Sequence, residues 1–192
     1  MMNISIHRPT AIDYEELTEL FRVVITDTME KEGLGGYDEQ INSEVKEKKK
    51  FLEEDVESNG EERFFLVARY REKIVGTVAY GPCGEAIKNC SKGKYNHMGE
   101  IGTVFILPQY QDKGIGSLLL NSMYLALMGM NVEEFCLDSG YTKAKQIWCK
   151  KLGEPNIIKK NYWGEGYDHF IWHRKLKEIT ITFDSPSTHR SQ

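Results

Sequence analysis

Apolar residues recur along this chain with two different periods, and each period predicts a different element. From Ile115 to Met130 they fall three or four residues apart, which predicts an amphipathic helix. Just before it, Ile101 and the residues at 104–107 form a near-continuous apolar run, typical of a strand covered on both faces. Pro108 ends that run. The pattern therefore predicts a buried strand, a turn and a helix in succession.

The remaining pattern predicts a mixed α/β fold. We expect a sheet of about six or seven strands with helices on both faces. The expected strands are 3–7, 63–70, 73–80, 135–138 and a hairpin of 156–163 with 167–175, and the expected helices start at Thr10 and cover 38–58 and 142–152. The segment 81–95 is expected to be a loop or a small insertion.

One domain accounts for most of the chain. A length of 192 residues suits a single domain, and we assign it to 1–176. Residues 177–192 are then a C-terminal extension. Its alternating run Ile-Thr-Ile-Thr-Phe at 179–183 predicts an added edge strand, followed by a polar, frayed tail.

The turn between the strand and the helix carries the clearest chemical signal. A helix N-terminus presents unpaired N–H groups and a partial positive charge, which suits an anion. Gly114 and Gly116 would let a bulky phosphate approach the backbone closely. The alternative is a plain strand-to-helix turn in which the glycines serve tight packing. The flanking strand and helix favour a phosphate-bearing ligand.

The same segment resembles a known family. Gln111-Asp112-Lys113-Gly114-Ile115-Gly116 is similar to the Q/R-x-x-G-x-G/A signature of the GNAT N-acetyltransferase superfamily. Ile106-Leu107-Pro108 resembles the V-x-P that precedes it, and Ala144 to Gly153 resembles the helix that follows the next strand. In order of elements the resemblance extends from Ile4 to about Leu176. It implies a GNAT-like fold, with the sheet split at its central strands beside Glu100, and acetyl-CoA as co-substrate. No metal is expected.

The resemblance also implies which residues bind acetyl-CoA. Main-chain N–H groups from Gln111 to Ser117 would bind the pyrophosphate, and Ser117 could add its hydroxyl. Lys113 is either a charge partner for a phosphate or an ordinary solvated lysine. The amide-bearing pantetheine arm would lie along Ile106 and Leu107 like an added strand, with Ser139 on its other side.

Two residues are candidates for the general base of an amine acetylation. Glu100 heads the apolar strand, so partial burial should raise its pKa; the alternative, an exposed glutamate at a strand end, has equal weight. His97 is the second candidate, although a loop histidine is more often a surface residue.

The sequence does not identify the general acid that would protonate the leaving thiolate. Trp148 stands where the family often has tyrosine, and indole gives up no proton at useful pH. The tyrosine role is therefore not carried over, and Tyr162 and Tyr141 become the candidates. Asp168 and His169 are neighbours on a predicted strand, so a direct pair between them is not expected.

The composition of the chain limits the classes of partner that it is expected to bind. A net charge of −4 does not favour nucleic acid or an anionic membrane. No secretory signal or long apolar stretch is found, and four cysteines without a C-x-x-C pair suggest reduced thiols in the cytoplasm. The spacing of Cys83, Cys90 and His97 does not match usual zinc sites.

The leading prediction is an N-acetyltransferase for a small primary amine. The acceptor pocket is expected between 28–37, 81–97 and the last hairpin around 163–169, because loops usually carry specificity. A non-catalytic acyl-CoA-binding or regulatory module and a protein N-acetyltransferase are the alternatives. A homodimer is left open.

Overall fold

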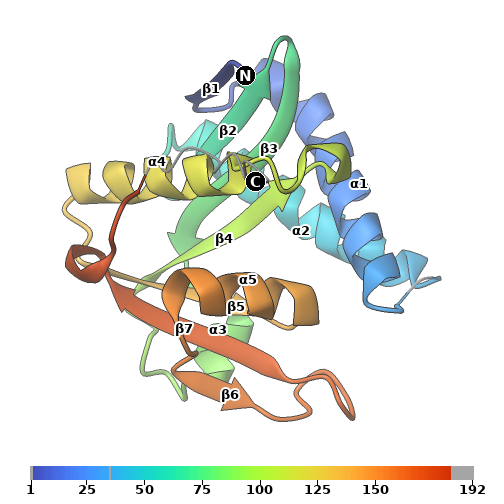
Figure 1. The fold of residues 1–192 in the computed structure, drawn as a ribbon, viewed down its shortest axis with the longest axis vertical. Coiled ribbons are helices and arrows are strands. Elements are labelled where there is room, and N and C mark those ends of the chain that lie inside the picture. Colours follow the sequence, from blue (N-terminus) through green and yellow to red (C-terminus); the bar gives the residue numbers. More distant parts are fainter. Residues whose placement is uncertain (1, 35, 183–192) are drawn as a thin grey trace, which may run out of the picture.

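A single seven-stranded sheet organises the protein. The structure is a computed structural model that describes residues 2–34 and 36–182. The strands lie in the order β1-β2-β3-β4-β5-β7-β6, and every neighbouring pair is antiparallel except β4 and β5, which are parallel (Figure 1). Their bounds are Ile4–His7 (β1), Phe64–Tyr70 (β2), Lys73–Pro82 (β3), Gly99–Ile106 (β4), Glu134–Ser139 (β5), Ile157–Lys159 (β6) and His169–Lys175 (β7).

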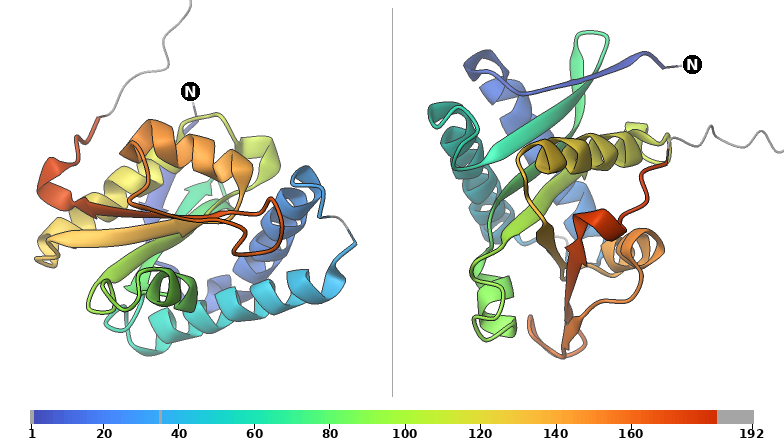
Figure 2. Two further views of the ribbon diagram at one scale, coloured as in Figure 1. Left: turned by 90° about the horizontal axis from the view of Figure 1, so that it is seen from below. Right: turned by 90° about the vertical axis from the view of Figure 1, so that its left-hand side faces the viewer.

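Five α-helices cover the two faces of this sheet. They are Tyr14–Lys31 (α1), Asp38–Glu57 (α2), Glu85–Cys90 (α3), Ile115–Gly129 (α4) and Thr142–Leu152 (α5). Figure 2 shows α1, α2 and α3 on one side of the sheet and α4 and α5 on the other. The predicted mixed α/β fold, with helices on both faces, is confirmed.

Each face has its own hydrophobic core. Under α4 and α5, fully buried side chains such as Leu119, Phe135 and Trp172 come from helices and sheet together. Under α1 and α2, the core includes Leu17, Phe21 and other residues that alternate along β2 and β3. Alternate strand residues point to opposite faces, so the two cores use different residues of the same strands.

Two local predictions were wrong. The segment at 81–95, predicted as a loop or a small insertion with no helix assigned to it, contains the short helix α3, whose Ile87 is buried in a third small cluster with Cys83, Cys136 and Ile171. Six residues are too few for a helical period to stand out in the sequence. Residues 179–182 form no strand; instead the Asn121 side-chain amide of α4 donates to the Thr182 carbonyl (2.6 Å). Residues 183–192 lie outside the described part.

The last hairpin is shorter than predicted. β6 has three residues and pairs with the first half of β7, and a nine-residue connection, 160–168, joins them. This connection contains Tyr162 and Trp163, so both lie in a loop rather than in a strand.

A buried ion pair joins β1, α2 and β2. The Asp55 side chain is completely buried and lies 2.8 Å from the Arg8 guanidinium. The same carboxylate oxygen accepts the Phe65 N–H at 2.9 Å. Breaking a buried pair leaves an uncompensated charge, so Asp55 is expected to be important for stability.

Candidate active site

The sheet splits between β4 and β5, next to Glu100. The two strands pair at only two positions, Gly99 with Phe135 and Glu100 with Cys136. Beyond these, β4 continues along β3 and β5 continues along β7 (Figure 1). The edge of β4 that faces β5 therefore has no strand partner after Glu100. Such an edge can accept an extended, amide-bearing ligand as if it were an added strand.

A β-bulge lies within this free part of β4. Two residues, Thr103 and Val104, stand opposite the single residue Val78 of β3. Thr103 has a positive φ of 49°, and its carbonyl accepts a hydrogen bond from the Thr77 hydroxyl (2.8 Å). Bulges bend a strand and redirect its backbone groups, and they are frequent beside active sites. No feature of the sequence predicted this bulge.

The glycine turn has the form that the sequence predicted. Gly114, with φ 81°, is the N-cap of α4, and Ile115 is the first helical residue. The first-turn N–H groups of α4, at Ile115, Gly116 and Ser117, have no acceptor within the helix. Asp112 also adopts a positive φ of 58°, which reverses the chain before the helix. The turn can therefore direct several N–H groups toward one anion.

The space at both glycines is open. A Cβ atom added at Gly114 would meet no atom within 4 Å, and one added at Gly116 would meet only Ile106 Cγ1, at 3.8 Å. Packing within the protein thus does not require glycine at position 116. The backbone of this turn is therefore open to the approach of a ligand.

The cation beside this turn comes from another helix. Lys151 of α5 donates to the Ser117 hydroxyl at 2.8 Å, and its partial burial lowers the pKa of the ammonium group. The Lys113 ammonium instead donates to the carbonyl of Gln109 in its own turn (2.7 Å). The sequence pointed to Lys113 and missed Lys151, because α5 contacts this turn only in the folded chain.

Ile106 and Leu107, the residues predicted to contact the pantetheine arm, lie at the end of β4 and just after it. Their backbone groups already have partners within the protein. The Leu107 N–H donates to the Val75 carbonyl of β3 (3.0 Å) and its side chain is buried under α1 and α2. Leu107 therefore has no free donor for a ligand. The Ile106 carbonyl accepts the Gln111 side-chain amide at 3.2 Å, which ties the end of β4 to the turn. Ser139, at the end of β5, accepts the Tyr141 N–H with its hydroxyl oxygen (3.1 Å).

Glu100 lies where the two strands separate. Its Oε2 accepts the N–H of Gly84, the N-cap of α3, at 2.7 Å. Burial, followed by the negative charge of Asp138, raises the pKa of Glu100 to about 8, although the Gly84 hydrogen bond acts in the opposite direction. A carboxyl group with such a pKa can take up a proton near neutral pH.

His97 lies at the paired end of the split. Its side chain is 69% exposed, and Nε2 is 3.9 Å from the Glu134 carboxylate at the start of β5. Both His97 and Glu134 precede the residues at which β4 and β5 pair, so His97 lies at the end of these strands that is away from the glycine turn. The structure therefore does not bring His97 together with the free edge of β4.

Several aromatic residues lie near the end of β5. Tyr162 stacks on the ring of His169, with 5.3 Å between ring centroids. The Tyr141 hydroxyl donates to Glu44 of α2 at 3.1 Å, and burial followed by this carboxylate raises the pKa of Tyr141. Trp148, in contrast, is buried in the core under α5.

The buried histidine of this group has a partner that the sequence did not reveal. His169 Nε2 lies 3.0 Å from Asp138 Oδ2, while its neighbour Asp168 binds Lys160 (2.7 Å). The expectation that Asp168 and His169 would not pair is confirmed. Asp138 lies 31 positions away in sequence, so no local pattern could have identified it.

Two of the three segments predicted to surround the acceptor, 28–37 and 163–169, reach this end of the sheet, whereas 81–97 ends at His97 on the paired end of the split. Glu32, just after α1, accepts the Lys143 N–H in the first turn of α5 (3.1 Å), and α2 approaches through Glu44. Residue 35 of the predicted segment 28–37 lies outside the described residues.

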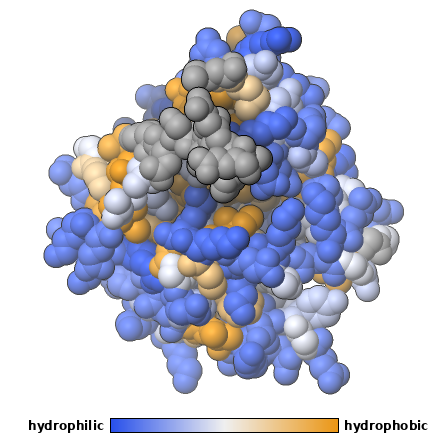
Figure 3. Space-filling view, viewed as in Figure 1, coloured by the Kyte–Doolittle hydropathy of each residue, from blue (hydrophilic) through white to orange (hydrophobic). Residues whose placement is uncertain are grey.

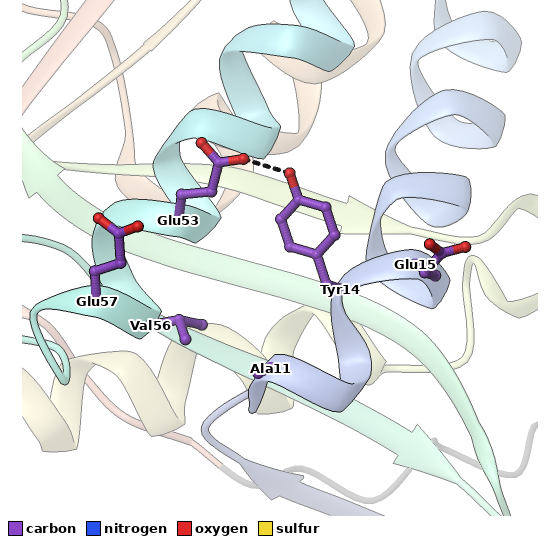
Figure 4. A pocket seen from close by; sticks show the side chains of 6 residues that line it. All are labelled: Ala11, Tyr14, Glu15, Glu53, Val56 and Glu57. Carbon is purple, nitrogen blue, oxygen red and sulfur yellow. Dashed lines mark hydrogen bonds between the residues drawn. The ribbon is translucent and has the colours of Figure 1, made fainter.

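A separate hollow lies at the far ends of α1 and α2. It has a volume of about 340 Å³ and is lined by Ala11, Tyr14, Glu15, Glu53, Val56 and Glu57. Figure 4 shows the Tyr14 hydroxyl pointing at Glu53, to which it donates a hydrogen bond. The connection between the helices, at their other ends, is the part that approaches α5, so this hollow belongs to a different region from the split.

Exposed apolar side chains also occur at the end of α4. Figure 3 shows them on the left-hand edge of the face that carries α4 and α5. Leu125, Met128 and Met130 are between 40% and 53% exposed. A homodimer stays a prediction.

Three further observations concern metals, thiols and membranes. Within residues 2–34 and 36–182, no group of three or more His, Cys, Asp or Glu side chains could hold a metal ion. All four cysteines are free. None of the helices in the described part of the chain is long and apolar enough to cross a membrane.

Solved structures with this fold include acetyltransferases. An acetyltransferase of the GNAT family from Desulfovibrio desulfuricans has a TM-score of 0.67 and 13% sequence identity, with 91% of this chain and 99% of that chain covered. The PaiA N-acetyltransferase from Thermoplasma acidophilum, in complex with coenzyme A, has a TM-score of 0.66 and 21% identity at the same coverage. An acetyltransferase from Salmonella typhimurium with its cofactor acetyl-CoA has 0.65 and 16%, with 97% and 99% covered.

A match to a protein-family model shows the family to which the chain belongs. No curated protein matches the chain in sequence. The model described as the acetyltransferase (GNAT) family matches residues 16–153, which include the split, the glycine turn and α5. The protein belongs to the acetyltransferase (GNAT) family and is an enzyme of the acyltransferase class.

Proposed function

We propose that the protein transfers an acetyl group from acetyl-CoA directly to a primary amine of a small molecule. The observation that carries this proposal is the position of Glu100, a carboxyl group with a raised pKa at the point where β4 and β5 separate. The free edge of β4 would bind the pantetheine arm, and the first turn of α4 the pyrophosphate. The free edge of β4 and the first turn of α4 belong to the same strand-turn-helix unit as Glu100.

Glu100 would act as the general base. An ammonium group must lose a proton before its nitrogen can attack the thioester carbonyl. With a pKa of about 8, the Glu100 carboxylate is a stronger base than an ordinary glutamate, and the Gly84 N–H fixes its orientation. The lone pair of nitrogen then forms the new C–N bond.

The backbone of β4 would stabilise the charge that develops on the carbonyl oxygen. N–H groups on the free edge, beside the bulge at Thr103, are fixed before the substrate arrives. One fixed donor in an oxyanion hole lowers the barrier by about 3 kcal/mol. When the tetrahedral species collapses, the C–S bond breaks and the thiolate of CoA leaves.

Tyr162 is our candidate for protonating that thiolate. Trp148 has no acidic group and is buried. Burial, followed by the Glu44 carboxylate to which its hydroxyl donates, raises the pKa of Tyr141 and makes it a poor acid. Tyr162 lies in the β6–β7 connection beside His169, at the open end of the split.

A small cationic acceptor fits the charges of this region better than a large one. The Asp138 carboxylate of β5 supplies negative charge at this end of the sheet, and this charge is one cause of the raised pKa of Glu100. Opposite charges raise the local concentration of a cationic amine. The sequence contains no long acidic or aromatic stretch that would suggest a groove for a peptide, which favours a small acceptor.

Release of the CoA thiol tests the proposal. Purified protein is incubated with acetyl-CoA and a panel of amines, polyamines, aminoglycosides, amino acids and peptides, and free thiol is measured. Amine-dependent thiol release is the expected result. Stoichiometric acetyl-CoA binding without amine-dependent release would instead support a non-catalytic acyl-CoA-binding module.

A further inference from the structure

A chain of hydrogen bonds leads from the split to an exposed indole. Asp138 Oδ2 lies 3.0 Å from His169 Nε2, and His169 Nδ1 lies 3.1 Å from Trp163 Nε1. An indole N–H can only donate, so Nδ1 of His169 must accept and carries no proton. The imidazole proton is then on Nε2 and points to the Asp138 carboxylate. The His169 side chain is 3% exposed, so this arrangement is enclosed by protein.

Trp163 is held at one edge while its ring faces solvent. It is 60% exposed, whereas the other two tryptophans, Trp148 and Trp172, are buried. Gly140 permits its position, because a Cβ atom there would lie 2.7 Å from the indole nitrogen. Tyr162 packs edge-on against it, with ring centroids 4.7 Å apart. An aromatic ring that is fixed in place yet exposed has already lost its conformational freedom, which favours binding of a ligand.

The indole lies on the same face of the sheet as Glu100. Glu100 is opposite Cys136, and side chains two residues apart on a strand share a face, so Asp138 follows on that face. On β7, His169 shares the face of Ile171, which is paired with Asp138. Gly140, which contacts the indole, is four residues beyond Cys136. At ~3.3 Å per residue, this places the indole roughly 13 Å along β5 from the proposed base.

We propose that Trp163 is a specificity-determining residue of the acceptor site that binds a second cationic group of an extended amine, and that the Asp138–His169 pair positions its indole. The inference rests on the proposed acetyl transfer at Glu100. The face of an indole attracts cations, tryptophan most strongly among the aromatic residues. The Asp138 carboxylate lies between Glu100 and the indole, so the path that the acceptor would follow carries negative charge.

The first test compares amines of one and two charges. The acceptors are α,ω-diamines of increasing length and the monoamine of each length. In Trp163→Ala, the KM for the longer diamines is expected to rise on the order of 10-fold relative to that for the matching monoamines. The acetyl-CoA KM should not change. Trp163→Phe keeps an aromatic face but lacks the N–H, so its effect should be smaller.

The control is Ile158→Ala. Ile158 is an exposed apolar residue on β6, 47% accessible, with no contact to His169 among the hydrogen bonds and ring pairs of this region. It should leave the ratio of diamine to monoamine KM unchanged. If Trp163→Ala raised the KM of monoamines and diamines equally, or changed neither, Trp163 would not recognise a second cation.

The second test uses the fluorescence of Trp163 and needs no catalysis. The emission of Trp163 is obtained as the difference between the wild type and Trp163→Phe. Long diamines should quench it in a saturable, concentration-dependent way, and the matching monoamines should quench it less. In His169→Gln the indole loses its fixed acceptor, so its quenching by acrylamide should increase and its response to diamines should weaken. Unchanged acrylamide quenching in His169→Gln would contradict the positioning role.

The two tests separate this inference from the proposed function. Amine-dependent thiol release with no role for Trp163 would overturn only the inference. Diamine-dependent quenching without thiol release would support the binding site and overturn the proposed acetyl transfer.

Discussion

Replacing Glu100 with glutamine should abolish the pH dependence that the base imposes on the reaction. Glutamine keeps the size of the side chain and a carbonyl oxygen that can accept the Gly84 N–H, which lies 2.7 Å from Glu100 Oε2. With a pKa of about 8, only about a tenth of the Glu100 side chains are ionised at pH 7. Wild-type kcat/KM should therefore rise about tenfold per pH unit up to pH 8 from this group alone.

The size of the effect follows from general base catalysis. A positioned base contributes on the order of 10²-fold to 10⁴-fold, so Glu100→Gln should lower kcat/KM at pH 8 by at least about 10². The Michaelis constant for acetyl-CoA should change little, because Glu100 lies upstream of the turn that we propose binds the pyrophosphate.

The assay is thiol release by both proteins between pH 6 and pH 9. Ionisation of the amine affects the wild type and the variant alike, so it cancels in the ratio of their kcat/KM values. The expected ratio increases up to about pH 8 and then becomes constant. A ratio near one, or a large ratio that does not vary with pH, would refute the assignment of Glu100 as the base.

The same substitution should change the pH dependence of stability. Because the pKa of Glu100 is raised in the folded state from 4.5 to about 8, the folded protein binds this proton more tightly than the unfolded chain. The stabilisation is fully present below pH 4.5 and is lost as the pH rises through about 8. This group can contribute up to about 1.4 kcal/mol per pH unit in that interval. Urea unfolding should show wild type losing stability relative to Glu100→Gln between pH 6 and pH 8; parallel curves would contradict the raised pKa.

Three further substitutions test other parts of the structure. Gly116→Val places a branched side chain in open space beside the turn, so calorimetry should show at least about tenfold weaker acetyl-CoA binding with little change in melting temperature; equal binding would mean that the pyrophosphate site is misplaced. Lys151→Met should weaken acetyl-CoA binding several-fold at low salt, on the order of 1 kcal/mol, whereas the exposed Lys150→Met should not. Asp55→Ala should destabilise the protein by about 3–5 kcal/mol in urea unfolding, because it leaves a partly buried guanidinium without its partner; a loss below about 1 kcal/mol would contradict this.

The features that the sequence predicted correctly are local ones. The helix α4 and its turn follow from a period of three to four residues and two glycines within one continuous segment. The β2–β3 hairpin and α5 follow from equally local patterns, and α5 was predicted with its observed bounds. The split beside Glu100 was predicted through the family resemblance rather than through any pattern of residues.

The features that the sequence missed depend on contacts between distant segments. Lys151 and Ser117 are 34 residues apart, and Asp138 and His169 are 31 apart. Neither pair has a signature in the sequence, because only the packed sheet and helices bring its members together. Trp163 was predicted to end a strand at 156–163, but it lies in the connection between β6 and β7, where its ring is exposed.

Mass spectrometry of the acetylated product tests the central claim most directly. The protein is incubated with acetyl-CoA carrying a deuterated acetyl group and a mixture of small amines and peptides, with Glu100→Gln as the matched control. The account predicts transfer of the labelled acetyl group to a primary amine of a small molecule by the wild type, and greatly reduced transfer by the variant. Label found only on peptides, or equal labelling by both proteins, would contradict it.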